Sequence, residues 1–299
     1  MKEIISELIK TNRPKLSPSS VKTYVSLLTS MYNKNKSCDD NEKDKEWFSK
    51  NCKTILESFK SLPENRRKTQ LSALYIVTQD KDVHNQMLKD LKVVNDHNAL
   101  QKKSVHEEEN WLSPEQIKTV YDQLKETATK MLNNKMPIDY EKIVQFFLLG
   151  FLGGVSGLSP RRSLDYALLK FQNYDPKSEN YIDKKGILFF NVFKTAKFYG
   201  SQQLSLKGEA PALFDLLKKW NKINPTDYVL FSSTQQPLTS SNITKIFSKI
   251  FEGRNISTNL FRHIFLSDQY KNVPALQKMQ QTASEMGHSV DQALLYVKK

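Results

Sequence analysis

The most apolar stretch of the chain, residues 143–158, sets the strongest limit on the fold. It contains Gln145, Ser156 and four glycines, and it is shorter than the roughly 20 apolar residues that a membrane-spanning helix needs. A helix that is apolar on every side must be surrounded by other protein. The stretch therefore predicts a buried helix in a globular domain, and no membrane partner is expected.

The charge of the chain favours a polyanionic partner. Basic residues outnumber acidic ones by 45 to 32, which gives a formal net charge of +13 at pH 7. The N-terminal segment MKEIISELIKTNRPK carries acids and lacks a small-residue cleavage site, so no secretory signal is predicted. Cys38 and Cys52 are too few for a disulfide framework or a cysteine zinc site. We therefore expect an intracellular protein in a reducing compartment.

Short amphipathic helices are predicted in the first hundred residues. Ser17 and Pro18 have the residue types preferred at a helix start, and further helices are expected over about 47–62 and after Pro63. The last of these carries three cations in its first turn, where they oppose the helix dipole. These cations are Arg66, Arg67 and Lys68. They form either a solvated face or a contact with DNA.

The periodicity of apolar residues fails between residues 93 and 110. The sequence therefore predicts a helical domain over residues 1–95, a linker over 96–110 and a second domain over 111–299. Ser113 and Gln116 form a capping box that opens a helix ending near Leu132. Residues 187–193 and 202–206 predict a β-hairpin, and the remaining helices are expected over 210–220, 240–251, 259–270 and 274–286. The predicted fold class is mainly α with a small β-hairpin or sheet (α+β), in two domains.

Four short motifs follow one another in the second domain. They are PRRSLDY at 160–166, FKTAKFYG at 193–200, NLFRH at 259–263 and MGHSVDQALLY at 286–296. In this order they resemble the tyrosine recombinase (phage integrase) family, and they look most like the recombinases of large eukaryotic DNA viruses and related mobile elements. The resemblance covers nearly the whole chain. It implies a helical core-binding domain that clamps double-stranded DNA and a catalytic domain with a small hairpin.

The first motif offers two arginines for the phosphate. Arg162 matches the family's first arginine because Asp165 follows it by three positions, whereas Arg161 is expected to face Leu164. A guanidinium fits two phosphate oxygens, and a nearby acid can hold it in place. The resemblance therefore implies that Arg162 is catalytic, that Asp165 supports it and that Arg161 contacts DNA. A surface arginine pair is the alternative.

The hairpin motif supplies the candidate general acid. Lys194 best matches the family's hairpin lysine, which would protonate the 5′ oxygen that leaves the phosphodiester. A shift of register would give this role to Lys197 instead. Both lysines could also be cations that only touch phosphate.

The third motif departs from the family pattern. Arg262 occupies the position of the second arginine, but Asn259 stands three residues earlier, where the family has a histidine. Asparagine can donate a hydrogen bond to phosphate but cannot take a proton as imidazole can. His263 resembles the frequent Arg-His pair of the family and is expected to be a packed helix residue.

The last motif supplies the candidate nucleophile. Gly287 and His288 match the family's Gly-His, whose histidine binds the scissile phosphate. Tyr296 follows eight residues after His288, one fewer than is usual, and is the expected nucleophile. A packed tyrosine in a terminal helix is the alternative.

The family's reaction passes through a 3′-phosphotyrosine intermediate without ATP, metal or another cofactor. No phosphate-binding loop and no metal-ligand spacing occur in the sequence. The resemblance implies a site-specific recombinase or integrase that acts as a homotetramer on two DNA sites, in the host cytoplasm or nucleus if it is viral. A type IB topoisomerase-like enzyme and a DNA-binding protein with a decayed site are the alternatives.

Overall fold

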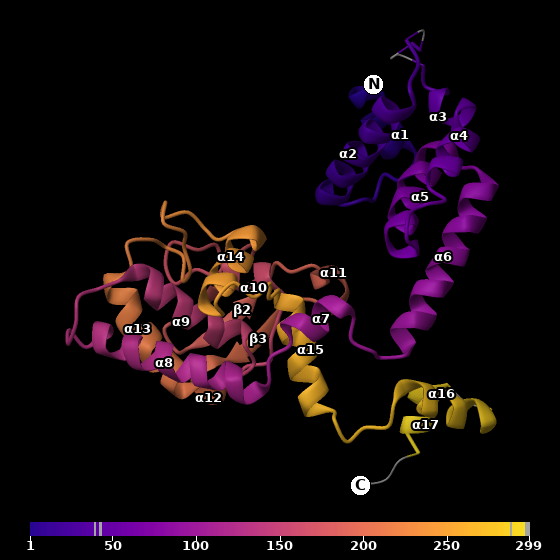
Figure 1. Ribbon diagram of the computed structural model, residues 1–299. Coiled ribbons are helices and arrows are strands. Elements are labelled where there is room, and N and C mark those ends of the chain that lie inside the picture. Colours follow the sequence, from indigo (N-terminus) through magenta and orange to yellow (C-terminus); the bar gives the residue numbers. More distant parts are fainter. Residues whose placement is uncertain (39, 42–43, 288, 297–299) are drawn as a thin grey trace. The chain divides into compact units, whose positions relative to one another are not determined.

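A computed structural model describes residues 1–38, 40–41, 44–287 and 289–296 (Figure 1). The chain divides into two compact units, one made of Met1–Lys102 with Pro274–Lys299 and the other of Lys103–Val273. The predicted assignment of residues 274–299 to the catalytic domain stays a prediction.

The first unit consists of helices. Its elements are α1 (Lys2–Asn12), α2 (Pro18–Asn35), α3 (Trp47–Lys50), α4 (Cys52–Ser58), α5 (Glu64–Thr78), α6 (Lys81–Ala99), α16 (Leu276–Glu285) and α17 (Val290–Leu294). As predicted, Ser17 caps α2, since its hydroxyl accepts a hydrogen bond from the Ser20 N–H, and Pro18 lies in the first turn. The helix predicted over 47–62 is instead two short helices. They are separated at Asn51, where the backbone (φ −100°, ψ 9°) leaves α-helical geometry.

The predicted linker contains more helix than the sequence suggested. Helix α6 continues to Ala99, and α7 (Val105–Asn110) begins after Ser104, which forms a capping box with Glu107. Most side chains between residues 91 and 109 are exposed, so these turns need no apolar face. Apolar periodicity was therefore lost over solvent-exposed helical turns as well as over the residues that connect them.

The second unit combines helices with a small sheet. Its helices are α7, α8 (Pro114–Leu132), α9 (Tyr140–Leu152), α10 (Ser163–Ala167), α11 (Ala196–Tyr199), α12 (Leu206–Glu209), α13 (Pro211–Ile223), α14 (Ser240–Ile250) and α15 (Thr258–Gln269). The strands β1 (Tyr181–Ile182), β2 (Ile187–Phe190) and β3 (Gln202–Ser205) form an antiparallel sheet in the order β1-β2-β3. The predicted hairpin is β2–β3, and the predicted fold class is confirmed.

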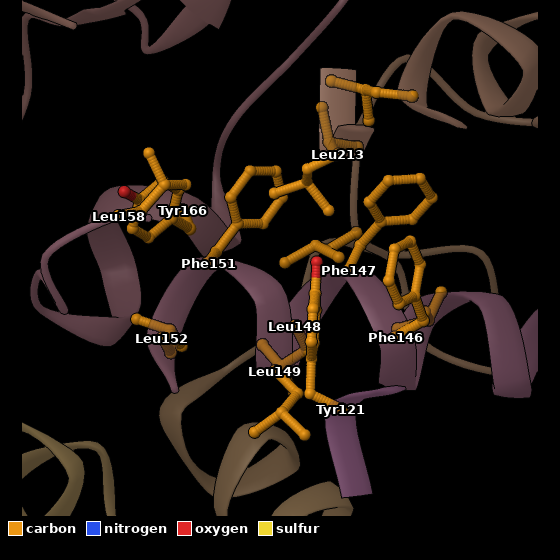
Figure 2. Close-up of a cluster of buried hydrophobic side chains, with 14 of the residues drawn as sticks. Tyr121, Phe146, Phe147, Leu148, Leu149, Phe151, Leu152, Leu158, Tyr166 and Leu213 are labelled. Atoms are coloured by element: carbon orange, nitrogen blue, oxygen red, sulfur yellow. The ribbon is translucent and has the colours of Figure 1, made fainter. Parts of the chain in front are cut away.

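Helix α9 lies at the centre of the second unit's core. Every side chain from Ile143 to Leu152 is buried, as the apolar stretch predicted. Figure 2 shows Phe151 beside Tyr166 of α10, and their rings stack with centroids 4.7 Å apart. This contact anchors α10, and with it the arginine motif, on the core. None of the helices formed by the described residues is both long and apolar enough to cross a membrane.

Candidate active site

Three arginines from two distant parts of the sequence act on one buried carboxylate. Asp165 on α10 is only 3% exposed. Burial raises the pKa of Asp165, while the positive charges of Arg161, Arg162 and Arg262 act in the opposite direction. Arg262 belongs to α15, about a hundred positions along the chain from α10. The fold thus brings the first and third motifs into one cationic cluster.

Arg161 is the arginine that Asp165 binds. Its Nε donates to Asp165 Oδ2 at 3.0 Å, and its Nη1 donates to Gln202 Oε1 on β3 at 2.8 Å. The guanidinium also stacks on Phe190, 4.1 Å from the ring centroid. Asp165 thus pairs with Arg161, whereas Arg162 occupies the N-cap of α10 with an extended backbone and acts on Asp165 through its charge. That Asp165 supports Arg162 stays a prediction. That Arg162 binds the phosphate stays a prediction.

Arg262 and Asn259 lie one turn apart on α15. The helix begins where the Ser257 hydroxyl accepts a hydrogen bond from the Leu260 N–H, and Phe261 is buried in the core. Arg262 Nη1 lies 3.4 Å from Asn259 Oδ1, which is a long hydrogen bond. Asn259 therefore takes part in the cluster as an acceptor for the arginine.

His263 does not pack into the core as expected. Its side chain is 56% exposed, and its Nδ1 pairs with Glu107 Oε1 of α7. The reason is helical geometry, because Phe261 and Ile264 take the buried face of α15 and leave His263 on the outer side. His263 thus connects α15 to α7 at the surface.

The pairing of Glu107 gives the domain a pH-dependent contribution to stability. Hydrogen bonds from the Ser104 N–H and hydroxyl, followed by His263, lower the pKa of Glu107 from 4.5 to about 2. A lowered pKa means that the stabilisation is complete above pH 4.5 and is lost as the pH falls towards 2. We expect Glu107→Gln to lower the free energy of unfolding at neutral pH, with an effect that shrinks as the pH falls below 4.5 and is smallest near pH 2, as measured by urea denaturation. Glu109→Gln, on the exposed side of α7, serves as control; an equal effect of Glu107→Gln at both pH values would contradict this assignment.

The lysines of the second motif lie between β2 and β3. Lys194 is exposed, and Lys197, also exposed, lies on α11 with its Nζ 5.3 Å from the Phe198 ring centroid. The backbone just before Lys194 is attached to α10 by Asn180, whose amide donates to the carbonyls of Asp165 and Val192. Asn180 was not predicted as a site residue, since a single buried polar residue produces no periodic pattern. The choice between the two lysines stays a prediction.

Tyr296 lies in the turn after α17, and its side chain is 57% exposed. The Ser289 hydroxyl caps this short helix. Tyr296 belongs to the first unit, whereas the arginine cluster belongs to the second. His288 lies outside the described residues. The roles of both residues stay predictions.

Arg67 has a structural role in the first unit. Its Nε and Nη2 each lie 2.7 Å from a carboxylate oxygen of Asp90 on α6, and Asp90 is 1% exposed. A third bond runs from Nη1 to the Leu62 carbonyl. Arg67 therefore holds α5 against α6. Its place between Arg66 and Lys68 in the sequence did not reveal this role. Arg66 is exposed and Lys68 half-buried, and their contact with DNA stays a prediction.

No protein family model matches the sequence, and no curated protein is similar to it. Solved structures do match. A lambda integrase dimer bound to a COC′ core site aligns with a TM-score of 0.47 and 12% identity over 91% of this chain and 70% of that one. XerA recombinase aligns with a TM-score of 0.35 and 15% identity over 99% and 94%. XerH site-specific recombinase bound to difH substrate aligns with a TM-score of 0.40 and 13% identity over 99% and 91%.

Proposed function

We propose that this protein cuts and rejoins double-stranded DNA through a covalent 3′-phosphotyrosine, as a site-specific recombinase or integrase. The gathering of Arg161, Arg162 and Arg262 around Asp165 is the observation that carries the proposal. Guanidinium groups aimed at a phosphate stabilise the negative charge that develops when the phosphate is attacked. The residue types and their order in the sequence are those of the tyrosine recombinase motifs.

In the proposed reaction the phenol oxygen of Tyr296 attacks the scissile phosphorus. A bond from phosphorus to the tyrosine oxygen forms, and the bond to the 5′ oxygen breaks. Lys194 gives a proton to the leaving oxygen, while Arg162, Arg262 and His288 neutralise the phosphate. The free 5′ hydroxyl of a partner strand then reverses the attack, so that no ATP and no metal ion enter the scheme.

Asn259 changes one step of this scheme. Its amide accepts a hydrogen bond from Arg262 and cannot take up the phenol proton. The proton therefore passes to water, and the positive cluster lowers the cost of forming the phenolate, whose ordinary pKa is about 10. Slow cleavage is the expected consequence.

The partners follow from the same resemblance. We propose a homotetramer on two DNA sites, of viral or mobile-element type, acting in the host cytoplasm or nucleus. Cys38 is exposed and Cys52 is buried, and both are free thiols, as suits a reducing compartment.

The proposal is tested by trapping the covalent intermediate. The protein is incubated with nicked duplexes from a random pool and from the DNA that flanks its gene, and adducts that resist SDS are isolated. After trypsin digestion, we expect the nucleotide on the peptide of residues 279–298, which contains Tyr296 as its only tyrosine. A nucleotide on any other peptide would refute the assignment of the nucleophile.

Relaxation of supercoiled DNA and gel retardation, measured beside the adduct, separate the alternatives. A type IB topoisomerase-like enzyme would form the adduct and relax supercoiled DNA without bringing two sites together. A binding protein with a decayed site would retard DNA in a gel and form no adduct at any salt concentration or pH.

A further inference from the structure

Asn180 uses the whole hydrogen-bonding capacity of a buried side-chain amide. The residue is 2% exposed. Its Nδ2 donates to the Asp165 carbonyl at 3.0 Å and to the Val192 carbonyl at 2.8 Å. Its Oδ1 accepts from the backbone N–H groups of Asn191 and Val192, at 2.9 and 2.8 Å. A buried amide bonded on both sides fixes the segments that it joins.

The two segments joined by Asn180 carry different parts of the candidate site. Asp165 lies on α10, a helix of five residues that is too short to satisfy its own last carbonyls. Val192 lies two residues before Lys194, and its backbone N–H and carbonyl both form hydrogen bonds with the Asn180 side chain. These bonds also explain why β2 ends at Phe190, before the end predicted from the sequence, since Asn191 and Val192 pair with a side chain there.

We infer that Asn180 is a positioning residue that sets the place of Lys194 relative to the arginine cluster. The inference rests on the proposed function, because it assigns Asn180 to the step in which the lysine protonates the leaving oxygen. A general acid works only within hydrogen-bond reach of its target. Lys194 itself is exposed, so the backbone that leads to it is what places its amine.

The test compares cleavage of two nicked duplexes that differ only in the leaving atom. One has the ordinary 5′ oxygen, and the other has sulfur at that bridging position. A thiol has a pKa of about 8.5 and leaves without a proton, so the sulfur substrate does not need the general acid. Rates of adduct formation are measured for the full-length wild type, Lys194→Ala and Asn180→Ala. Asn180→Asp, which keeps the size and the acceptor but loses both donors, is the second variant if Asn180→Ala does not fold.

We expect Asn180→Ala to slow cleavage of the oxygen substrate by roughly 10-fold to 100-fold, and that of the sulfur substrate by less than about threefold. Lys194→Ala should show the same pattern with a larger loss on oxygen. Asn224→Ala is the matched control, because Asn224 is a buried asparagine whose side chain bonds the Tyr228 carbonyl and the Thr226 N–H and hydroxyl, within a single loop. It should leave both rates within about threefold of wild type.

Three outcomes would overturn the inference. Equal losses on both substrates would mean that Asn180 supports the arginines or the fold as a whole. Unchanged rates would mean that the lysine does not depend on it. If the wild type forms no adduct with either substrate, the proposed function itself fails, and this inference with it; that result is distinct from the first two, in which the wild type is active.

Discussion

Tyr296→Phe is expected to lower adduct formation at least about 1,000-fold while DNA binding stays within about twofold of wild type. The substitution removes only the oxygen that would form the bond to phosphorus. More than half of this side chain is exposed, and urea denaturation of both proteins is measured beside the adduct so that a change of stability is recognised. Adducts are measured on denaturing gels and binding by gel retardation, on the same nicked duplex.

Tyr270→Phe is the control for Tyr296→Phe. Tyr270 is also an exposed tyrosine, at the end of α15, and it lies outside the four motifs. Its variant should form adducts at the wild-type rate. If Tyr296→Phe keeps its adduct, another residue is the nucleophile and the C-terminal motif has been misinterpreted.

Arg262→Ala is expected to slow adduct formation by about 100-fold to 1,000-fold. Its guanidinium is half-buried beside Asp165 and makes one long hydrogen bond, to Asn259, so it keeps donors that can turn to a phosphate. Arg262→Lys should recover only part of the loss, because an ammonium cannot hold two phosphate oxygens in a planar fork. Single-turnover rates at saturating DNA isolate this effect from binding.

Arg254→Ala is the control for Arg262→Ala. Arg254 is an exposed arginine just before α15, and its removal takes away the same charge without touching the cluster. It should weaken DNA binding slightly and leave the single-turnover rate unchanged. A rate for Arg262→Ala within threefold of wild type would show that the cluster around Asp165 does not act on the reacting phosphate.

Much of the fold could be predicted from local signals. Caps and apolar faces correctly placed the starts of α2 and α8 and the buried helix α9. Local signals failed at Asn51, where the backbone leaves helical geometry between α3 and α4. Strand β1 has two residues and is too short to leave a pattern.

The pairing of the candidate site residues could not be predicted from the motifs. The motifs led to Arg162, Arg262 and Lys194, but the partner of Asp165 is Arg161. The partner of Arg67 lies on a different helix, 23 positions away, at Asp90. Such pairs depend on how helices pack. The residues around each partner in the sequence do not show which helices pack together.

The arginine that is held by Asp165, Gln202 and the Phe190 ring has already given up its freedom of rotation. A free arginine side chain has about 2 kcal/mol of rotamer entropy to lose when it is ordered. Arg161 loses it as the domain folds, so a phosphate that reaches this guanidinium meets a group whose direction is already fixed. Under the proposed function, the exposed Lys194 is instead ordered on contact with DNA. The entropic cost of fixing Arg161 is met when the domain folds, whereas that of fixing Lys194 falls on the binding step.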